Sequence, residues 1–234
     1  MILNIKNFKF VFVHIPKCGG TSISHCLSLG NEEFYKYNGF RHNTLTQDIT
    51  FSQKQNCYIN PDEIFIFSSV RNPWDRFVSI YHFHRIIKEN DYPWIEFCKK
   101  HSFLDFIKYG EDNHEKMIVY NTYKEFLFYN GKLKSDYIID FNNLKNDFAL
   151  ISKLLKNKKK LPKINSTDHK EYRFYYNSYA EESIRKHFLE DIELFKFSFE
   201  EPKKITLPKP NFQKIKLLFP NETKIMYNKS IKLS

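Results

Sequence analysis

Residues 8–22 read FKFVFVHIPKCGGTS, and this stretch indicates the fold. Its first part, residues 8–15, is a run of apolar and β-forming residues, which is typical of a strand buried on both faces of a parallel sheet. A proline ends the run, two glycines predict a turn, and residues 21–29 predict a helix. We therefore expect a strand, a glycine turn and a helix in succession.

The same order recurs further along the chain. Residues 64–70, IFIFSSV, predict a second buried strand, and Asn72 and Pro73 are a typical N-cap and first position of a helix that reaches about Lys88. Residues 137–141 predict a third strand and residues 142–155 another helix. Alternating strands and helices favour an α/β fold, in which a parallel sheet is covered on both faces and ligands bind at the carboxyl ends of the strands.

The remaining segments are less regular. An S-x-x-E capping box at Ser178 and Glu181 predicts a helix over residues 178–197. Residues 89–116 contain a predicted helix at 102–109 and are expected to form a lid or a wall of the site. We expect one domain over residues 1–200, followed by a basic, proline-containing C-terminal extension over residues 201–234.

Composition narrows the class of protein. A chain of 234 residues has room for one domain of ordinary size. It lacks a run of eighteen apolar residues and a signal-peptide pattern, so we expect no transmembrane segment and a cytoplasmic location, with peripheral attachment to a membrane left open. Four cysteines without a C-x-x-C pair predict reduced thiols: Cys18, Cys26, Cys57 and Cys98.

The net charge of +10 favours an anionic ligand. Of the 37 basic residues, 31 are lysine, so the six arginines are the more informative cations. Three of them, Arg71, Arg76 and Arg85, fall within fifteen residues, where planar guanidinium groups suit phosphate recognition. The alternative is that Arg71 and Arg76 are solvated or paired with Asp75, and for Arg76 the sequence leaves this alternative and a phosphate ligand equally open.

Residues 15–22 predict a first anion site. A turn that joins a strand to a helix presents free backbone N–H groups and the positive end of the helix dipole. Gly19 and Gly20 allow a close approach, the hydroxyl groups of Thr21 and Ser22 add donors, and Lys17 supplies a full charge. The Walker pattern of nucleotide kinases does not fit, because Lys17 precedes both glycines.

Arg71 predicts a second anion site at the end of the second strand. A phosphotransferase usually has a Mg²⁺-binding Asp at this place, whereas this chain has a cation. Ser79 lies two turns into the following helix, so Arg71 and Ser79 could contact one phosphate. Two anion sites in one crevice predict a nucleoside ligand that carries phosphate groups at two ends.

Two sequence motifs now suggest a family. IPKCGGTS at residues 15–22 and VRNPWDRFVS at residues 70–79, about fifty residues apart, resemble the two nucleotide-binding motifs of the carbohydrate sulfotransferases, a family of Golgi enzymes with bacterial relatives. Weaker similarity covers residues 121–155 and 172–199. The resemblance implies a P-loop-like three-layer fold with a central parallel sheet flanked by helices. It also implies transfer of a sulfuryl group from 3′-phosphoadenosine 5′-phosphosulfate to a hydroxyl of a carbohydrate acceptor, such as a surface-glycan precursor.

The resemblance also implies roles for residues. Lys17 would stabilise the departing bridging oxygen, and Arg71 and Ser79 would hold the 3′-phosphate. Contacts to the 5′-phosphosulfate would come from Lys17, Cys18, Gly19, Gly20, Thr21 and Ser22. Cys18 stands where relatives usually have Thr, which matters little if that position binds through its backbone. Asn142 stands where many relatives have Glu.

His42 is the predicted general base, because it follows the first helix and resembles the H-x-T segment at the acceptor side of the family. Lys170 and Arg173 are candidates to close over the nucleotide. We expect no metal cofactor, because sulfuryl transfer depends on positioning and electrostatics and the sequence contains no convincing ligand set. His82 and His84 form an H-x-H pattern, but they point apart on a helix.

Two alternative functions remain open. One is a P-loop-like nucleotide kinase, which would need ATP and Mg²⁺. The other is a non-enzymatic basic module that binds a polyanion, which the net charge and the lysines of residues 156–160 favour. That lysine cluster lacks interleaved aromatic residues, so we expect no binding to nucleic acid.

Overall fold

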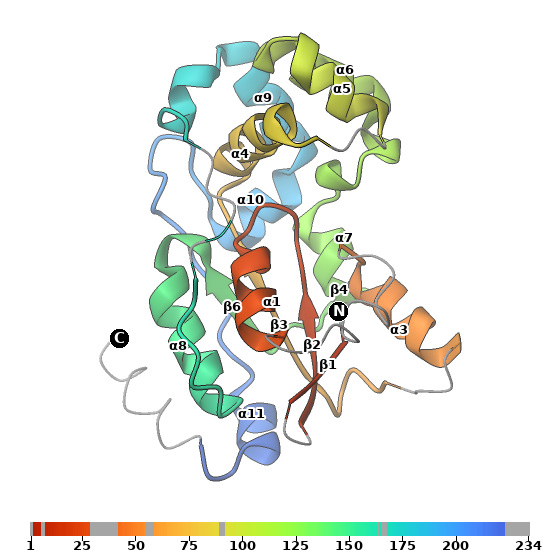
Figure 1. Cartoon of the computed structure of the whole chain (residues 1–234), viewed down its shortest axis with the longest axis vertical. Helices are drawn as coiled ribbons and strands as arrows, with labels where there is room; N and C mark the ends of the chain where they lie inside the picture. The colour runs from red at the N-terminus through yellow and green to blue at the C-terminus, as the bar shows by residue number, and fades with distance from the viewer. Residues whose placement is uncertain are drawn as a thin grey trace.

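The computed structural model describes residues 2–5, 8–28, 42–54, 59–88, 92–162, 164 and 168–222. Within these residues the main sheet has the strand order β1-β2-β3-β6 and lies in the lower half of the molecule in Figure 1. Three neighbouring strands are parallel: β2 (Phe8–Val13), β3 (Phe65–Val70) and β6 (Tyr137–Asp140). The edge strand β1 (Ile2–Ile5) runs antiparallel to β2.

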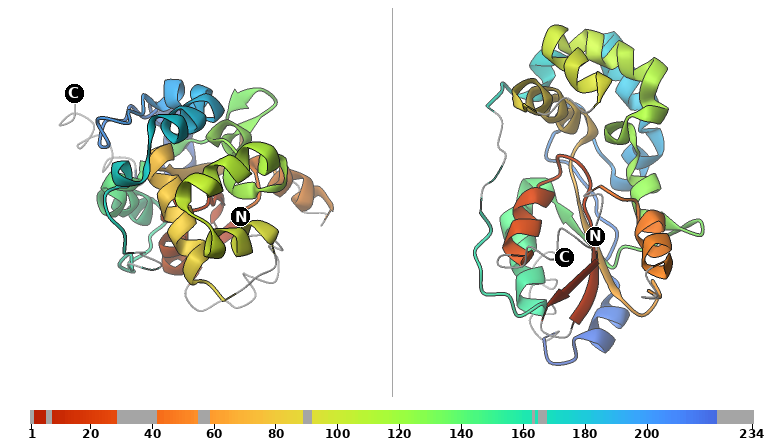
Figure 2. Two further views of the ribbon diagram at one scale, coloured as in Figure 1. Left: turned by 90° about the horizontal axis from the view of Figure 1, so that it is seen from above. Right: turned by 45° about the vertical axis from the view of Figure 1, so that its right-hand side comes forward.

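Helices cover both faces of this sheet, as the right-hand view of Figure 2 shows. One face packs against α1 (Gly20–Ser28), α8 (Leu144–Leu154) and α11 (Phe212–Leu218). The other packs against α3 (Leu45–Lys54) and α7 (Tyr123–Leu127). The predicted α/β fold, a parallel sheet between two layers of helices in the P-loop-like arrangement, is confirmed.

Side chains along β2 alternate between the two layers. Phe10 and Phe12 join the apolar cluster under α1 and α8, whereas Val11 and Val13 join the cluster on the opposite face. All four are fully buried. A strand with two buried faces carries an apolar residue at nearly every position, which is the continuous pattern in the sequence.

A second group of helices lies beyond the carboxyl ends of the strands, at the top of Figure 1. It consists of α4 (Pro73–Ile86), α5 (Pro93–Lys100), α6 (Phe103–Asn113), α9 (Ser178–His187) and α10 (Leu189–Phe195). Residues 93–113 are thus two helices packed on α4.

The shorter elements are β4 (Phe128–Tyr129), β5 (Lys132–Leu133), η1 (His114–Lys116), η2 (Ile118–Tyr120), η3 (Phe141–Asn143) and η4 (Tyr172–Tyr175).

Local sequence explains where several helices begin. The side chain of Asn72 accepts the Trp74 N–H at 3.1 Å, and Pro73 is the first residue of α4, as predicted. Ser102 caps α6 through a capping box. The predicted continuous helix over 178–197 is wrong.

Two short helices replace that predicted helix. Asn177, not Ser178, caps α9, because its side-chain oxygen Oδ1 accepts the Ala180 N–H at 2.9 Å. The chain then turns at Phe188, whose φ and ψ of −103° and 22° are not helical. The Phe188 ring is fully buried against Phe77, with ring centres 5.4 Å apart, and this packing favours the turn over a straight helix.

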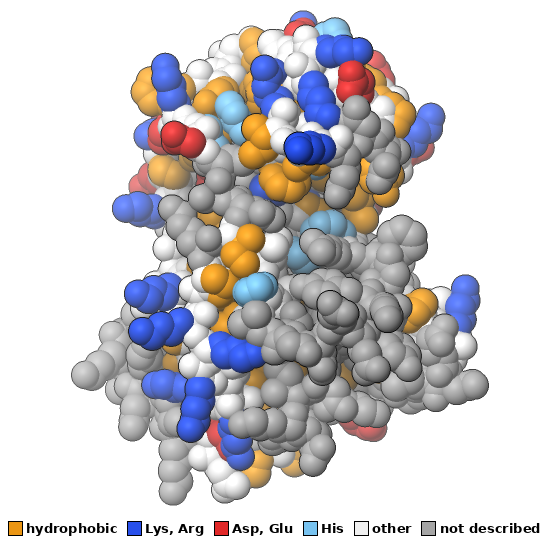
Figure 3. Space-filling view, viewed as in Figure 1, with side chains coloured by type: hydrophobic (Ala, Val, Ile, Leu, Met, Phe, Trp, Pro, Cys, Tyr) orange, Lys and Arg blue, Asp and Glu red, His pale blue; other side chains and the backbone are white. Residues whose placement is uncertain are grey.

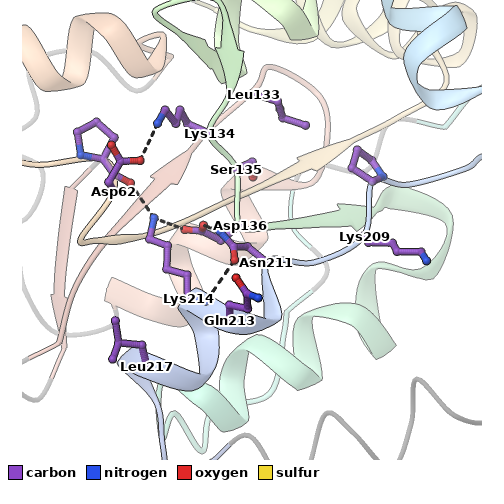
Figure 4. A pocket seen from close by; sticks show the side chains of 12 residues that line it. Asp62, Leu133, Lys134, Ser135, Asp136, Lys209, Asn211, Gln213, Lys214 and Leu217 are labelled. Atoms are coloured by element: carbon purple, nitrogen blue, oxygen red, sulfur yellow. Dashed lines mark hydrogen bonds and ion pairs between the residues drawn. The ribbon is translucent and has the colours of Figure 1, made fainter.

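The segment after residue 200 returns to the opposite end of the sheet. Lys214 pairs with the Asp136 carboxylate at 2.8 Å, and that carboxylate also accepts the Ile66 N–H at 2.8 Å (Figure 4). Ile215 and Phe219 are buried against the sheet. These contacts border a groove of about 550 Å³ at the amino ends of β3 and β6, at the opposite end of the sheet from both predicted anion sites. The domain boundary at residue 200 stays a prediction.

On the face shown in Figure 3, Lys and Arg side chains gather over α8 and the segment that follows it. Among the described residues, no helix combines the length and apolar character that crossing a membrane requires. The free thiols of Cys18, Cys26 and Cys98 are buried, and Cys57 lies outside the described residues.

Candidate active site

The carboxyl ends of the three parallel strands bring the two predicted anion motifs together. β2 leads into the loop of Lys17, β3 leads into Arg71, and β6 leads into Phe141. Arg71 Nη1 donates a hydrogen bond to the Lys17 carbonyl at 3.2 Å, although 54 residues separate the two in sequence. The Arg71 guanidinium also lies 4.2 Å from the centre of the Phe141 ring. Both motifs therefore belong to one site.

The loop before α1 depends on its two glycines. Gly19 has a φ of +82°, in the left-handed region that favours glycine, and an added Cβ would lie 2.7 Å from a methyl carbon of Leu144. A Cβ on Gly20 would lie 2.0 Å from the His14 ring. Lys17 itself has a φ of +63°, so the loop contains a second residue in the left-handed region.

The start of α1 leaves N–H groups available to a ligand. The first helical hydrogen bond runs from the Ile23 N–H to the Gly19 carbonyl at 3.3 Å. The N–H groups of Gly20, Thr21 and Ser22 precede it and so have no partner within the helix. Together with the helix dipole, they form a place for an anionic group.

The Lys17 ammonium group lies beside this helix start. Its Nζ is 3.8 Å from the centre of the Phe83 ring, and the side chain is half-buried. Burial, reinforced by the nearby Arg71 cation, lowers the pKa of Lys17 to about 8. Two cations at one partly buried place are electrostatically unfavourable unless an anion joins them.

Cys18 points away from this space. Its thiol is fully buried, and Sγ lies 3.6 Å from the Pro16 carbonyl and 3.9 Å from the Tyr123 hydroxyl. Burial raises the pKa of this thiol, so it stays protonated. The Cys18 carbonyl accepts a hydrogen bond from the Ser69 hydroxyl at 2.7 Å. The backbone of Cys18 therefore lines the first anion loop, whereas its side chain packs into the core.

Arg71 is rigidly held. Its Nε and Nη2 donate to the two carboxylate oxygens of Asp75 at 2.6 and 2.9 Å. With the Lys17 carbonyl and the Phe141 face, these contacts fix the plane of the guanidinium directly before the N-terminus of α4. Ser79, its predicted partner, is buried two turns further along α4.

Arg76 has a role that the sequence did not indicate. It is fully buried and donates to backbone carbonyls rather than to Asp75, so the alternative of a solvated or Asp75-paired group is wrong for Arg76, whereas Arg71 does pair with Asp75. Its guanidinium donates to three backbone carbonyls, those of Pro16 at 3.1 Å, Asn121 at 3.2 Å and Val119 at 3.1 Å. Arg76 thus ties the first anion loop to the segment between η2 and α7.

Of the hydroxyl residues in the first motif, Thr21 is partly exposed and Ser22 is buried. The Ser22 hydroxyl accepts the Ile164 N–H at 3.1 Å. Ile164 belongs to the segment after α8, where Asn157 also donates to the Cys26 carbonyl of α1 at 3.1 Å. In the right-hand view of Figure 2 the described part of this segment runs past α1.

Two histidines, His14 and His42, lie beside the first anion loop. His42 Nδ1 lies 2.9 Å from the His14 carbonyl, and the two rings make an edge contact with centres 4.6 Å apart. Because a carbonyl only accepts, Nδ1 carries the proton of a neutral His42 ring, and Nε2 is then its basic nitrogen. The structure therefore places His42 next to the first anion loop.

His84 is a neighbour of the site that sequence reasoning missed. Its Nδ1 donates to the Ile80 carbonyl at 2.7 Å, and its ring makes an edge contact with Trp94. Burial, reinforced by the nearby Lys17 and His42 and opposed by the hydrogen bond to the Ile80 carbonyl, lowers the pKa of His84 to about 4. The ring is therefore neutral near neutral pH. The sequence predicted that His84 lies on the helix that follows Arg71. It did not show which element the His84 face of that helix contacts.

Arg173 is not brought into contact with the two anion motifs. It lies exposed on η4, where its Nε donates to both Glu171 carboxylate oxygens at 3.1 Å and Nη1 donates to the Glu200 carbonyl at 3.3 Å. The neighbouring Tyr176 hydroxyl donates to the Trp74 carbonyl at 2.9 Å, which fastens this region to α4.

No metal centre is apparent in the part of the chain that the structure describes, because no three His, Cys, Asp or Glu side chains gather there. His82 and His84 diverge: the His82 ring stacks on His169, whereas the His84 ring contacts Trp94. The groups that converge here are cations and N–H donors, which suit a polyanionic ligand.

Comparison with protein families agrees with these features. The sulfotransferase family matches residues 2–198, which include β1 to β6, both anion motifs and α9. Comparison with curated proteins finds no match, and comparison with solved structures finds none either. Because the family match covers most of the chain, the chain belongs to the sulfotransferase family.

Proposed function

We propose that this sulfotransferase moves a sulfuryl group from 3′-phosphoadenosine 5′-phosphosulfate to a hydroxyl of a carbohydrate acceptor. The observation that carries the proposal is the 3.2 Å hydrogen bond between Arg71 and the Lys17 carbonyl. It joins two anion-binding motifs at one edge of the sheet, which suits a single nucleoside with phosphate groups at both ends. The carbohydrate acceptor is inferred from the resemblance of residues 15–22 and 70–79 to carbohydrate sulfotransferases.

The residues divide between the two ends of the donor. Arg71 and Ser79 hold the 3′-phosphate, while the backbone from Cys18 to Ser22 holds the 5′-phosphosulfate at the start of α1. Lys17 supports the bridging oxygen. We further propose that Arg173 closes over the bound nucleotide, which requires it to leave its contacts with Glu171 and Glu200.

The reaction exchanges one sulfur–oxygen bond for another. The acceptor oxygen bonds to sulfur as the bond from sulfur to the bridging phosphate oxygen breaks, and negative charge develops on that oxygen. The Lys17 ammonium and the helix N–H groups stabilise this charge. The acceptor hydroxyl loses its proton to His42 Nε2. No step in this scheme requires a metal ion.

The kinase alternative fits the contacts less well. β3 ends with Ser69 and Val70 before Arg71, so a cation stands where a kinase needs an acidic ligand for Mg²⁺. The acidic side chain of Asp75 accepts two hydrogen bonds from Arg71. The lysines of residues 156–160 that favoured a polyanion-binding module lie on the segment that crosses α1, outside the two anion motifs.

Thermal denaturation distinguishes these functions. Adenosine 3′,5′-bisphosphate without Mg²⁺ should raise the melting temperature, whereas ATP with Mg²⁺ should not. Stabilisation by ATP with Mg²⁺ but not by adenosine 3′,5′-bisphosphate would contradict the proposal and favour a kinase. Incubation with radiolabelled donor and a panel of glycans then identifies the acceptor, and Lys17→Ala should abolish transfer while scarcely changing affinity for an unspecific polyanion.

A further inference from the structure

Phe83 lies directly against the ammonium group of Lys17. It belongs to the last turn of α4, is half-buried, and its ring centre is 3.8 Å from Lys17 Nζ. A cation this close to an aromatic face is attracted by the negative charge of the π system, and the attraction grows when water is excluded. The contact joins the loop after β2 to the far end of α4.

The other groups around Lys17 do not offer it a stabilising charge. The Arg71 guanidinium repels it, the Cys18 thiol is protonated, and His84 is neutral. The nearby carboxylate of Asp75 is engaged by Arg71. Among the described residues no carboxylate pairs with Lys17. The Phe83 ring is therefore the favourable contact that the ammonium group makes.

We propose that Phe83 is a positioning residue for Lys17, and that its ring face holds the charged ammonium group beside the first anion loop. The inference rests on the catalytic role of Lys17 in the proposed function. Phe83 restricts Lys17 to the side of the loop that Arg71 also borders, and it favours the protonated form that a departing phosphate oxygen needs. Phe83 on α4 thus positions the ammonium group of Lys17 on the loop after β2.

The test measures how readily Lys17 loses its proton. Acetylation by acetic anhydride, followed at the Lys17 peptide by mass spectrometry across a pH series, reports this because only the neutral amine reacts. In Phe83→Leu the midpoint should fall by about half a pH unit, since an aromatic face contributes about 0.5–1 kcal/mol and 1.36 kcal/mol corresponds to one pKa unit. In Phe83→Tyr it should stay within about 0.2 units of wild type, because a tyrosine ring also binds cations.

Two further proteins make the result decisive. Trifluorophenylalanine at position 83 keeps the shape of the ring but weakens its negative face, so it should lower the midpoint even if Phe83→Leu folds poorly. Phe174→Leu is the matched control, because Phe174 is exposed and lies 6.0 Å from Lys170 rather than near Lys17. An unchanged Lys17 midpoint in the fluorinated protein, or a fall in Phe83→Tyr as large as in Phe83→Leu, would overturn the inference.

The assay separates this inference from the proposed function because it uses no nucleotide. If wild-type protein failed to bind adenosine 3′,5′-bisphosphate, the proposed function would fail while the Lys17 midpoint still tested the contact with Phe83. If the protein bound that nucleotide but the Lys17 acetylation midpoint did not change in the Phe83 variants, only the positioning role of Phe83 would be contradicted.

Discussion

Arg76 donates a hydrogen bond from Nε to the Pro16 carbonyl at 3.1 Å, which fastens α4 to the loop that begins the first anion motif. The same guanidinium donates to two carbonyls of the segment before α7. No carboxylate is among the partners that the structure gives for its side chain, so Arg76 acts as a buried donor to backbone rather than as half of an ion pair. Arg76 therefore has a structural role in holding these two segments together.

Replacing Arg76 should therefore disturb both stability and binding. Arg76→Ala removes the guanidinium donor from three backbone carbonyls, two of them in buried hydrogen bonds, which should lower the free energy of unfolding by about 3 kcal/mol or more. Urea denaturation measures this loss. Arg85→Ala is the matched control, since Arg85 is exposed and the change should cost about 1 kcal/mol or less. Equal losses in the two variants would contradict the bracing role.

Gly20 should be intolerant of any side chain, because a Cβ there would lie 2.0 Å from the His14 ring. Gly20→Ala must push that ring or the start of α1 aside, and we expect the affinity for adenosine 3′,5′-bisphosphate to fall by about tenfold or more, the equivalent of one lost charged hydrogen bond. Calorimetric titration measures this. Gly110→Ala meets a similar clash, 1.8 Å from the Tyr120 hydroxyl oxygen, but lies away from the site. It should destabilise the fold and leave the affinity of the folded protein unchanged.

The strands and both anion motifs could be predicted from the sequence because each depends on a local pattern. The apolar run before Pro16, the glycines after Lys17 and the Asn72–Pro73 pair each specify their conformation within a few residues. That Lys17 and Arg71 meet follows from one further rule, since parallel strands present their carboxyl ends at the same edge of a sheet. The sequence was therefore sufficient to predict those features whose conformation depends on interactions between neighbouring residues.

The remaining features depend on contacts between distant segments. Nothing in the local sequence marks Arg76 as buried, and only the approach of Pro16 and Val119 makes it a buried donor. The break at Phe188 has the same origin, because an apolar stripe continues through it and only the packing on Phe77 shows that the helix turns. His84 could be placed on α4 but not next to Lys17, since periodicity does not tell which element a helix face meets.

Arg71 should distinguish nucleotides by their 3′-phosphate. Arg71→Lys keeps the charge but loses the planar fork that Asp75 orients, so the affinity for adenosine 3′,5′-bisphosphate should fall by roughly tenfold to a hundredfold. The affinity for adenosine 5′-monophosphate, which lacks the 3′ group, should change by less than about twofold. Titration with both nucleotides tests the assignment, and an equal loss for the two would move Arg71 to the 5′ end.

His42 should affect transfer but not nucleotide binding. Its Nδ1 is engaged by the His14 carbonyl, which orients Nε2 as the proton acceptor. His42→Ala should lower the transfer rate by about 10²- to 10⁴-fold, the usual contribution of a general base, with an unchanged dissociation constant for adenosine 3′,5′-bisphosphate. His25→Ala is the control, because His25 is exposed on α1. A normal transfer rate in His42→Ala would assign proton removal to another group.

Nucleotide affinity should depend on pH through Lys17. Burial and the Arg71 cation lower the pKa of Lys17 to about 8, so the cationic form, which attracts the phosphosulfate, predominates below that pH and is lost as the pH rises. A bound anion raises this pKa again, and one proton is therefore taken up on binding at alkaline pH. The association constant for adenosine 3′,5′-bisphosphate should be nearly level between pH 7 and 7.5 and then fall by up to about tenfold per pH unit above 8. Calorimetric titration in buffers of different ionisation enthalpy measures both the fall and the proton uptake. In Lys17→Ala the alkaline fall should disappear, and a fall that persists in this variant would assign the titration to a different group.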